Sequence, residues 1–369
     1  MSEDFLPIKK MDHVEFYVGN AKQAAHYYRT GFGFANSAYS GLETGNRDRA
    51  SYVMEQGNVR LVLSTALTPD HPIARHAHLH GDGVAVIAME VPDAASAYKE
   101  STARGATGAI PPTREEDEYG VISYSAIRAY GDTLIKFVDR SQYNGPFWPG
   151  YQARNGFELD KKGRHPGYGL AHIDHMVGNV ELGAMNRWVD FFANTMGFSQ
   201  LLHFDNEDIS TEYSALMSKV MQNGNGKVKF PINEPAEGKK KSQIQEYLDF
   251  YYGPGVQHIA LSTGNILETV TKLKESGIDF LTVPTTYYDV LEDRVGKINE
   301  PIDKLAELGI LVDRDEEGYL LQIFTKPVED RPTVFFEIIE RHGSRGFGKG
   351  NFKALFEAIE REQDLRGNL

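Results

Sequence analysis

Short apolar stretches and amphipathic stretches follow one another along the chain in a repeating order. In the first half, apolar or alternating residues predict strands at residues 11–18, 50–55, 59–64, 83–91, 120–130 and 133–138. Helical spacing of apolar residues, ended by glycine, predicts helices at residues 20–31 and 93–104. The order strand, helix and further strands therefore occurs twice within this half.

A turn-rich segment separates this half from a second one. Glycine and proline recur between residues 141 and 169 without a sustained period. AHIDHMV at 171–177 then resembles the MDHV that begins at residue 11, and a helix at 265–276 matches the one at 93–104. The helix after residue 177 is expected to carry one apolar stripe, formed by Leu182, Met185, Trp188, Val189 and Phe192.

A repeat this long indicates a duplicated domain rather than a solenoid. The sequence predicts a first half at residues 1–142, a link at 143–170 and a second half at 171–369. A last helix begins near Asn351, with four apolar residues at helical spacing, Phe352, Leu355, Phe356 and Ile359. This stripe must cover apolar surface, and it either packs on the core or closes a pocket.

The composition is that of a soluble globular protein, with 41% hydrophobic and 25% charged residues. No apolar run approaches the roughly 18 residues of a membrane span, and the acidic first residues lack the apolar core of a signal peptide. We therefore expect a cytoplasmic protein without a membrane partner. The net charge of -13 argues against a nucleic-acid partner. Because the chain has no cysteine, a metal would have to be held by His, Asp and Glu.

One strand differs between the halves in a chemically informative way. GPGVQHIAL at 253–261 is a copy of GDGVAVIAM at 81–89, with His258 where the first half has Val86. A lone histidine on an apolar strand face is more often a hydrogen-bonded core residue than a ligand. Strand alternation places His258 on one face and Gln257 on the other.

Two further positions join His258. His175 matches His13, and Glu337 matches Lys136 when the strands 133–140 and 333–341 are aligned from their shared arginine ends. A carboxylate in an apolar strand is costly unless it is paired, hydrogen-bonded or bound to a metal. Two histidines and one carboxylate from separate strands make a facial triad suited to non-haem Fe(II). The first half lacks this set, so we expect it to be metal-free and structural.

Several longer motifs together carry a resemblance to a known family. They are IDH at 173–175, PINEP at 231–235, KKSQIQ at 240–245, GVQHIA at 255–260, LQIFTKP at 321–327, FFEII at 335–339 and GFGKGNF at 346–352. The chain resembles 4-hydroxyphenylpyruvate dioxygenase over nearly its whole length. This resemblance implies an α+β fold, in which duplicated βαβββ modules form two open β-barrels of the vicinal-oxygen-chelate type with a closing C-terminal helix.

The resemblance also implies a cofactor, a pocket and a reaction. Fe(II) would be held in the second barrel by His175, His258 and Glu337. The substrate pocket would be lined by Ser218, Asn233, Gln243, Gln322, Phe324, Phe347 and Phe352. Gln257 also matches a family glutamine, but alternation turns it away, so we expect it behind His258. The implied reaction converts 4-hydroxyphenylpyruvate, an aromatic α-keto acid, and O2 to homogentisate and CO2 in tyrosine and phenylalanine catabolism, with ring hydroxylation and side-chain migration.

Three alternatives stay open on the same scaffold. A 4-hydroxymandelate synthase shares the fold, substrate and triad but oxidises the benzylic carbon. An extradiol dioxygenase shares the scaffold and triad. A metal-free binding protein shares only the scaffold, and the intact triad argues against this third alternative. Because family members form dimers or tetramers, we expect a homo-oligomer.

Overall fold

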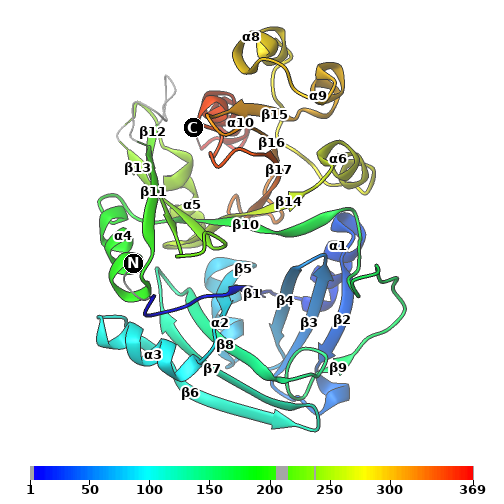
Figure 1. The fold of residues 1–369 in the computed structure, drawn as a ribbon, viewed down its shortest axis with the longest axis vertical. Helices are drawn as coiled ribbons and strands as arrows, with labels where there is room; N and C mark the ends of the chain where they lie inside the picture. The colour runs from blue at the N-terminus through cyan, green and yellow to red at the C-terminus, as the bar shows by residue number, and fades with distance from the viewer. Residues whose placement is uncertain (1–3, 205–214, 237, 369) are drawn as a thin grey trace.

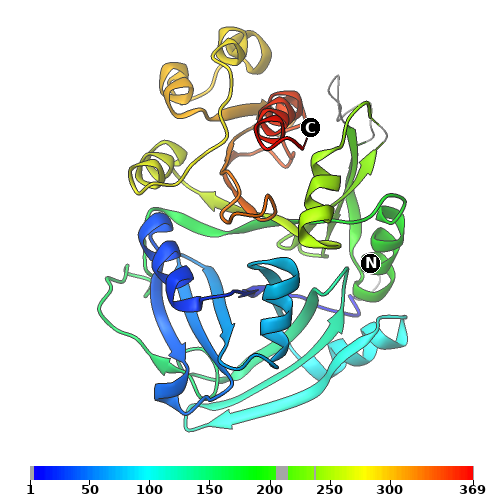
Figure 2. The same ribbon diagram turned by 180° about the vertical axis from the view of Figure 1, so that it is seen from behind.

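Two strongly curved β-sheets stand one above the other in the computed structural model, which describes residues 4–204, 215–236 and 238–368 (Figure 1). The first half, blue to cyan in the figure, forms one sheet, and the second half forms the other. Seen from behind, the C-terminal helix, in red, lies beside the second sheet (Figure 2). No helix in the described ranges has the length and apolar character needed to cross a membrane.

Each half contains two βαβββ modules. The first half has the strands β1 Lys10–Tyr17, β2 Ala35–Ser40, β3 Arg49–Gln56, β4 Val59–Ala66, β5 Gly83–Glu90, β6 Gly108–Asp117, β7 Gly120–Arg128, β8 Leu134–Tyr143 and β9 Gln152–Ala153, with the helices α1 Ala21–Phe32, α2 Pro72–His80 and α3 Ala94–Ala103. The second half has the strands β10 Leu170–Asn179, β11 Ser199–Phe204, β12 Ala215–Gln222, β13 Lys229–Ala236, β14 Gly255–Thr263, β15 Leu311–Arg314, β16 Tyr319–Phe324 and β17 Phe335–His342. Its helices are α4 Met185–Met196, α5 Gln243–Tyr251, α6 Ile266–Glu275, α7 Thr286–Asp289, α8 Leu291–Val295, α9 Ile302–Leu308 and α10 Phe352–Leu365.

The two sheets have the same strand order. The first runs β6-β7-β8-β5-β1-β4-β3-β2-β9, and the second, taken from its other edge, runs β15-β16-β17-β14-β10-β13-β12-β11. Every strand from β1 to β8 therefore has a counterpart in the second sheet, and β9 is an addition to the first. The predicted fold class is confirmed, and so is the duplication on which it rests.

The duplication extends to the irregularities of the sheets. The register of β1 shifts just before His13 and leaves Asp12 as an extra residue, a β-bulge. The register of β10 shifts just before His175 and leaves Asp174 as the extra residue. A bulge re-aims the side chains beside it, so the two halves share a device for directing a histidine.

Most predicted helix limits agree with the structure because they depend on local capping. The side chain of Asn20 accepts a hydrogen bond from the backbone of Gln23 at the start of α1, and Gly33 ends that helix with φ 75. Asp93 and Asn265 cap α3 and α6 in the same way. The apolar stripe predicted for α4 is wrong at Leu182. This residue lies before the first residue of the helix and is 63% exposed.

Five helices escaped the sequence patterns, namely α2, α5, α7, α8 and α9, and two of them, α2 and α5, lie where the halves meet. The buried residues of α2 include His76 and His80. The His80 ring donates a hydrogen bond to the backbone carbonyl of Tyr251, the last residue of α5. Because these two polar rings are buried in α2, the apolar spacing that marks a helix is weak there. In α5 a helical stripe is present, formed by Ile244, Tyr247, Leu248 and Tyr251, so that helix could have been predicted from its spacing. Part of the expected link, Phe147 to Tyr151, is buried against the first sheet.

Aromatic packing joins the halves behind the second sheet. Phe336 in β17 is fully buried, and its ring centroid lies 5.0 Å from that of Phe32 and 5.9 Å from that of Tyr28, both in α1. Because side chains alternate along a strand, this contact turns the neighbouring Glu337 to the opposite face, into the second barrel.

Candidate metal centre

Three neighbouring strands, β10, β14 and β17, bring His175, His258 and Glu337 together. Ala260 in the middle strand pairs with His175 on one side and with Glu337 on the other, which fixes their common depth in the sheet. The Nε2 atoms of His175 and His258 lie 3.2 and 3.4 Å from Oε2 of Glu337. One ligand atom from each side chain lies within 4.8 Å of the others, and all three side chains are largely buried.

Bulge residues set the proton positions on both rings. The carboxylate of Asp174 accepts a hydrogen bond from Nδ1 of His175 at 2.8 Å. The side-chain oxygen of Gln257 accepts one from Nδ1 of His258 at 3.0 Å. With Nδ1 protonated in both rings, each neutral imidazole keeps its lone pair on Nε2, the atom that faces Glu337.

The expected orientation of Gln257 is therefore wrong. In the pairing of β14 with β10, Val177 faces His258 and Gly178 faces Val256, so Gln257 is an extra residue. Alternation fails at such a bulge, and Gln257 turns towards the same cavity as His258 instead of away from it. It does support His258 from behind, as expected, because the two side chains are hydrogen-bonded.

Asp174 has a second partner that holds it in place. Arg341 donates to both of its oxygens, from Nε and Nη2, at 2.8 Å each. Burial alone would raise the pKa of Asp174, but the hydrogen bonds from Arg341 and His175 hold it well below its usual range. The sequence signal for this support was the IDH motif and the arginine shared by the aligned strands.

The donor set fits a bound cation. Burial would raise the pKa of Glu337, but the adjacent His175 and His258 lower it to about 2, so it is a carboxylate at neutral pH. Two imidazole lone pairs and a carboxylate that converge in a buried place repel one another unless a proton or a metal ion lies between them. Two histidines with one carboxylate on one face are ligands of a divalent transition metal.

A second group of potential ligands is already satisfied by the protein. Among the described residues, Glu300, Glu340 and His342 also lie within ligand distance of one another. However, Glu340 accepts a hydrogen bond from the backbone of Ile266 at the start of α6, and Glu300 accepts one from Tyr319. Both carboxylates also contact the His342 ring, so this group anchors α6 and needs no metal.

A cavity of about 80 Å³ opens directly above the three converging atoms. The structure places all ten residues that the sequence singled out around it: His175, Ser218, Asn233, Gln243, His258, Gln322, Phe324, Glu337, Phe347 and Phe352. Ser218 and Asn233 are directly paired across β12 and β13, and Phe324 is paired with Glu337 across β16 and β17, so each pair shares a face. The buried side-chain oxygen of Gln322 has no hydrogen-bond partner within the described chain.

Helices supply the remaining walls of this cavity. Gln243 is the first residue of α5, and Phe352 is the first residue of α10. The α10 residues Leu355, Phe356 and Ile359 also line the cavity. The apolar stripe of the last helix therefore covers the site, and these three residues were identified in the sequence only as a stripe, because nothing local shows what a stripe covers.

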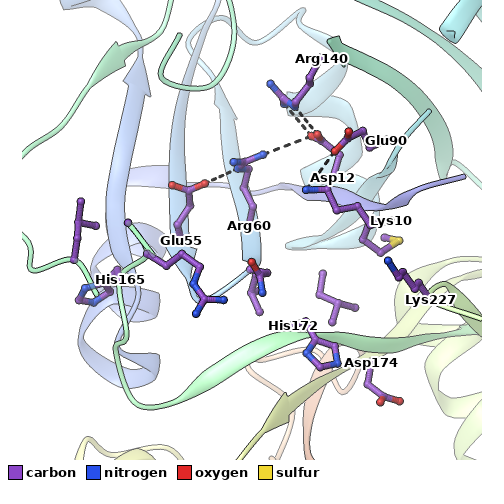
Figure 3. A pocket seen from close by; sticks show the side chains of 18 of the residues that line it. Lys10, Asp12, Glu55, Arg60, Glu90, Arg140, His165, His172, Asp174 and Lys227 are labelled. Atoms are coloured by element: carbon purple, nitrogen blue, oxygen red, sulfur yellow. Dashed lines mark hydrogen bonds and ion pairs between the residues drawn. The ribbon is translucent and has the colours of Figure 1, made fainter. Parts of the chain in front are cut away.

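A larger cavity lies elsewhere, in a crevice of about 780 Å³ between the two halves (Figure 3). Asp12 and Arg140 of the first half face it, and Asp174 and His172 of the second half lie on its opposite wall. Its charged groups are largely paired with one another, as Asp12 is with Arg140. The three candidate metal ligands do not line this crevice, and only the carboxylate of Asp174, which bonds one of them, reaches it.

Fold and site together define a metalloprotein built on a duplicated βαβββ scaffold. The model of the Glyoxalase/Bleomycin resistance protein/Dioxygenase superfamily matches residues 10–128 and 169–323. Proteins named 4-hydroxyphenylpyruvate dioxygenase are similar over almost the full length: that of Dictyostelium discoideum is 49% identical, covering 97% of this chain and 99% of the relative. That of Yarrowia lipolytica is 47% identical, covering 97% and 93%. The chain belongs to the 4-hydroxyphenylpyruvate dioxygenase family.

Solved structures agree on the fold. A mutant of 4-hydroxymandelate synthase from Streptomyces coelicolor superposes with a TM-score of 0.86 at 31% identity, covering 97% of this chain and 100% of that one. A fusion of a xylose isomerase-like TIM barrel with a 4-hydroxyphenylpyruvate dioxygenase superposes with a TM-score of 0.73 at 22% identity, covering 96% of this chain and 53% of that one. The second likeness concerns the fold alone.

Proposed function

We propose that the chain is an Fe(II)-dependent dioxygenase that converts 4-hydroxyphenylpyruvate and O2 to homogentisate and CO2 in tyrosine catabolism. The observation that carries this proposal is the set of three converging ligand atoms below a cavity lined by amides and phenyl rings. The identity of nearly half of all residues to full-length relatives of that name supports the choice of substrate.

His175, His258 and Glu337 would hold the iron, because two histidines and a carboxylate on one face leave positions open for exogenous ligands. Iron bound there supplies Lewis acidity towards the keto acid and activates O2. The protein's part is to keep each Nε2 lone pair available, which the hydrogen bonds that Nδ1 of His175 and His258 donate to Asp174 and Gln257 ensure.

The cavity walls would orient the substrate. The rings of Phe324 and Phe347 lie on either side of the ligand set, with centroids 6.1 Å from the His258 ring and 4.9 Å from the His175 ring. An aromatic substrate between them gains offset or edge-on contacts. The amides of Asn233, Gln243 and Gln322 are neutral hydrogen-bonding groups that suit a phenolic hydroxyl, and the unpartnered oxygen of Gln322 is a free acceptor for it.

The C-terminal helix would keep water out of the reaction. Phe352 and Phe356 of α10 form part of the cavity wall, and Arg366 at the end of this helix donates to both oxygens of Glu246 in α5. A covered, apolar site protects a reactive oxidant from side reactions.

A second candidate is 4-hydroxymandelate synthase activity, because a structure of such an enzyme superposes over its whole length. The lower identity, 31% against 47% and 49% for two dioxygenases, favours homogentisate formation. Both reactions use the same substrate, so only the product distinguishes them.

The test is to load the protein anaerobically with Fe(II), add 4-hydroxyphenylpyruvate and O2, count the CO2 released and identify the aromatic product. We expect homogentisate in equal amount to CO2. If 4-hydroxymandelate forms instead, the ring-hydroxylation assignment is wrong. Iron-loaded protein that releases no CO2 from this substrate would refute both activities. We also infer a cytoplasmic homo-oligomer from the family resemblance, which light scattering of the purified protein and fractionation of the source cells would test.

A further inference from the structure

The first barrel contains a cavity of about 450 Å³ at the place that corresponds to the metal centre. Lys136 pairs with Ala88 of β5 as Glu337 pairs with Ala260 of β14, and His13 pairs with Ala88 as His175 does with Ala260. All three positions that correspond to the metal ligands, His13, Val86 and Lys136, line this cavity. The first half has therefore kept a cavity and the histidine His13, but has Val86 and Lys136 in place of the other two ligands.

Lys136 brings a positive charge to the position of the metal-binding carboxylate. Its Nζ lies 5.3 Å from the ring centroid of Trp148 and 5.6 Å from that of Tyr124. In the part of the chain that the structure describes, no carboxylate oxygen lies within 4.0 Å of this nitrogen, whereas Arg49 and Arg140 are each paired with a carboxylate. An ammonium group has three N–H donors, and here they face the cavity.

Lys136 is half-buried, and the partial loss of water around its ammonium group has an energetic cost that an anion would offset. Burial and the nearby charge of Arg49 lower the pKa of Lys136, whereas the more distant carboxylates of Glu15, Glu115 and Asp12 act in the opposite sense. Glu15 is engaged by Arg49 and by the hydroxyl of Ser64.

Aromatic side chains form the wall beside Lys136. Glu115 accepts one hydrogen bond from the hydroxyl of Tyr124 at 2.5 Å and another from the indole nitrogen of Trp148 at 3.0 Å, which fixes both rings. Phe147 and Tyr151 complete the wall. A volume of about 450 Å³ is within the range of small-molecule sites, roughly 300–1,000 Å³. In contrast to the second half, the first half has, among the residues that the structure describes, no helix after its last long strand, β8, that would correspond to α10.

We propose that the first half binds a small aromatic carboxylate in this cavity, with the carboxylate against Lys136 and the ring against the wall that contains Trp148. The proposal goes beyond the dioxygenase reaction and does not depend on it, because every group it uses lies in the first sheet or in the start of the link, which packs on that sheet.

The two tryptophans of the chain make a selective test possible. In a Trp188→Phe protein the remaining Trp148 reports on the first cavity alone. Titration with phenylacetate should change its emission saturably, and the neutral isostere phenylacetamide should bind at least about tenfold more weakly, since it cannot make a charge-assisted hydrogen bond. Adding Glu337→Gln should leave this titration unchanged, which separates it from binding at the metal centre.

Variants of the lysine complete the experiment. Lys136→Met should weaken phenylacetate binding at least about tenfold, and Lys136→Arg, which keeps the charge, should restore most of it. Homogentisate formation should be unaffected in both. Two outcomes in the Trp188→Phe protein, which keeps Lys136, would overturn the proposal even if a lysine variant failed to fold. One is the absence of a saturable change in emission, and the other is equal binding of phenylacetate and phenylacetamide. Unaltered binding in folded Lys136→Met would overturn it as well.

Discussion

Asp174→Asn should weaken metal binding although Asp174 does not contact the metal. Asp174 is 5% exposed and accepts hydrogen bonds from Nδ1 of His175 and from two nitrogens of Arg341. An asparagine of the same shape presents an NH2 group, which only donates, where an acceptor is needed. If this group faces the His175 ring, the bond that holds the lone pair on Nε2 is lost. If it faces Arg341, the ring keeps its bond to a neutral oxygen, but one bond from Arg341 and the negative charge behind the ring are lost.

The expected losses follow from these contacts. Removal of such a support typically lowers metal affinity 10- to 100-fold, which is about 1.4–2.7 kcal/mol. The apo protein should also lose stability, because Arg341 keeps a charge without its carboxylate. Breaking a buried pair costs about 3–5 kcal/mol, and since the Arg341 side chain is 18% exposed, we expect about 2–3 kcal/mol.

The first half provides the matched control. Asp12 occupies the equivalent bulge, bonds His13 and is held by Arg140, with side-chain exposures of 2% and 17%. Asp12→Asn should therefore cost similar apo stability in urea unfolding but leave metal affinity unchanged, as measured anaerobically by competition with a chromogenic chelator. The reasoning fails if Asp174→Asn keeps its affinity within about twofold, or if Asp12→Asn loses as much.

Three further predictions use other parts of the molecule. His258→Ala should abolish iron retention and CO2 release, whereas His172→Ala, on the crevice side, should retain both; metal analysis after gel filtration checks this. His76 is 7% exposed, and its ring nitrogens have no hydrogen-bond partner among the described residues. Burial lowers its pKa to about 4. As pH falls, His76 is therefore protonated first in the unfolded protein. The neutral His76 ring contributes up to about 3 kcal/mol of stability, which is complete above pH 6.5 and is lost between pH 6.5 and 4. His76→Phe should therefore flatten the pH dependence of urea unfolding between pH 6.5 and 4. An unchanged slope would contradict this prediction. Arg366→Met should remove the ion pair with Glu246, leaving that carboxylate only its bond from Asn368, and accelerate hydrogen exchange in α10 at least about fivefold, while exchange in α1 stays the same. Equal rates in α10 would show that apolar packing alone holds the helix.

The amino-acid sequence by itself determined what depends on local order. The repeat, the helix ends capped by Asn20 and Asp93, and the three positions at which the halves differ follow from spacing and residue type. The comparison of halves worked because duplicated strands keep their register, and a difference such as His258 against Val86 is then a difference at one place in space.

The tertiary structure decided what depends on the partner strand or on packing. Alternation misplaced Gln257 because a bulge is set by the register between β14 and β10, which no single strand reveals. The roles of Asp174 and Arg341 depend on residues 167 positions apart meeting across the sheet. The surface that α10 covers and the cavity around Lys136 both result from how separate elements pack. An apolar stripe or a single charged residue in a sequence does not specify its neighbours.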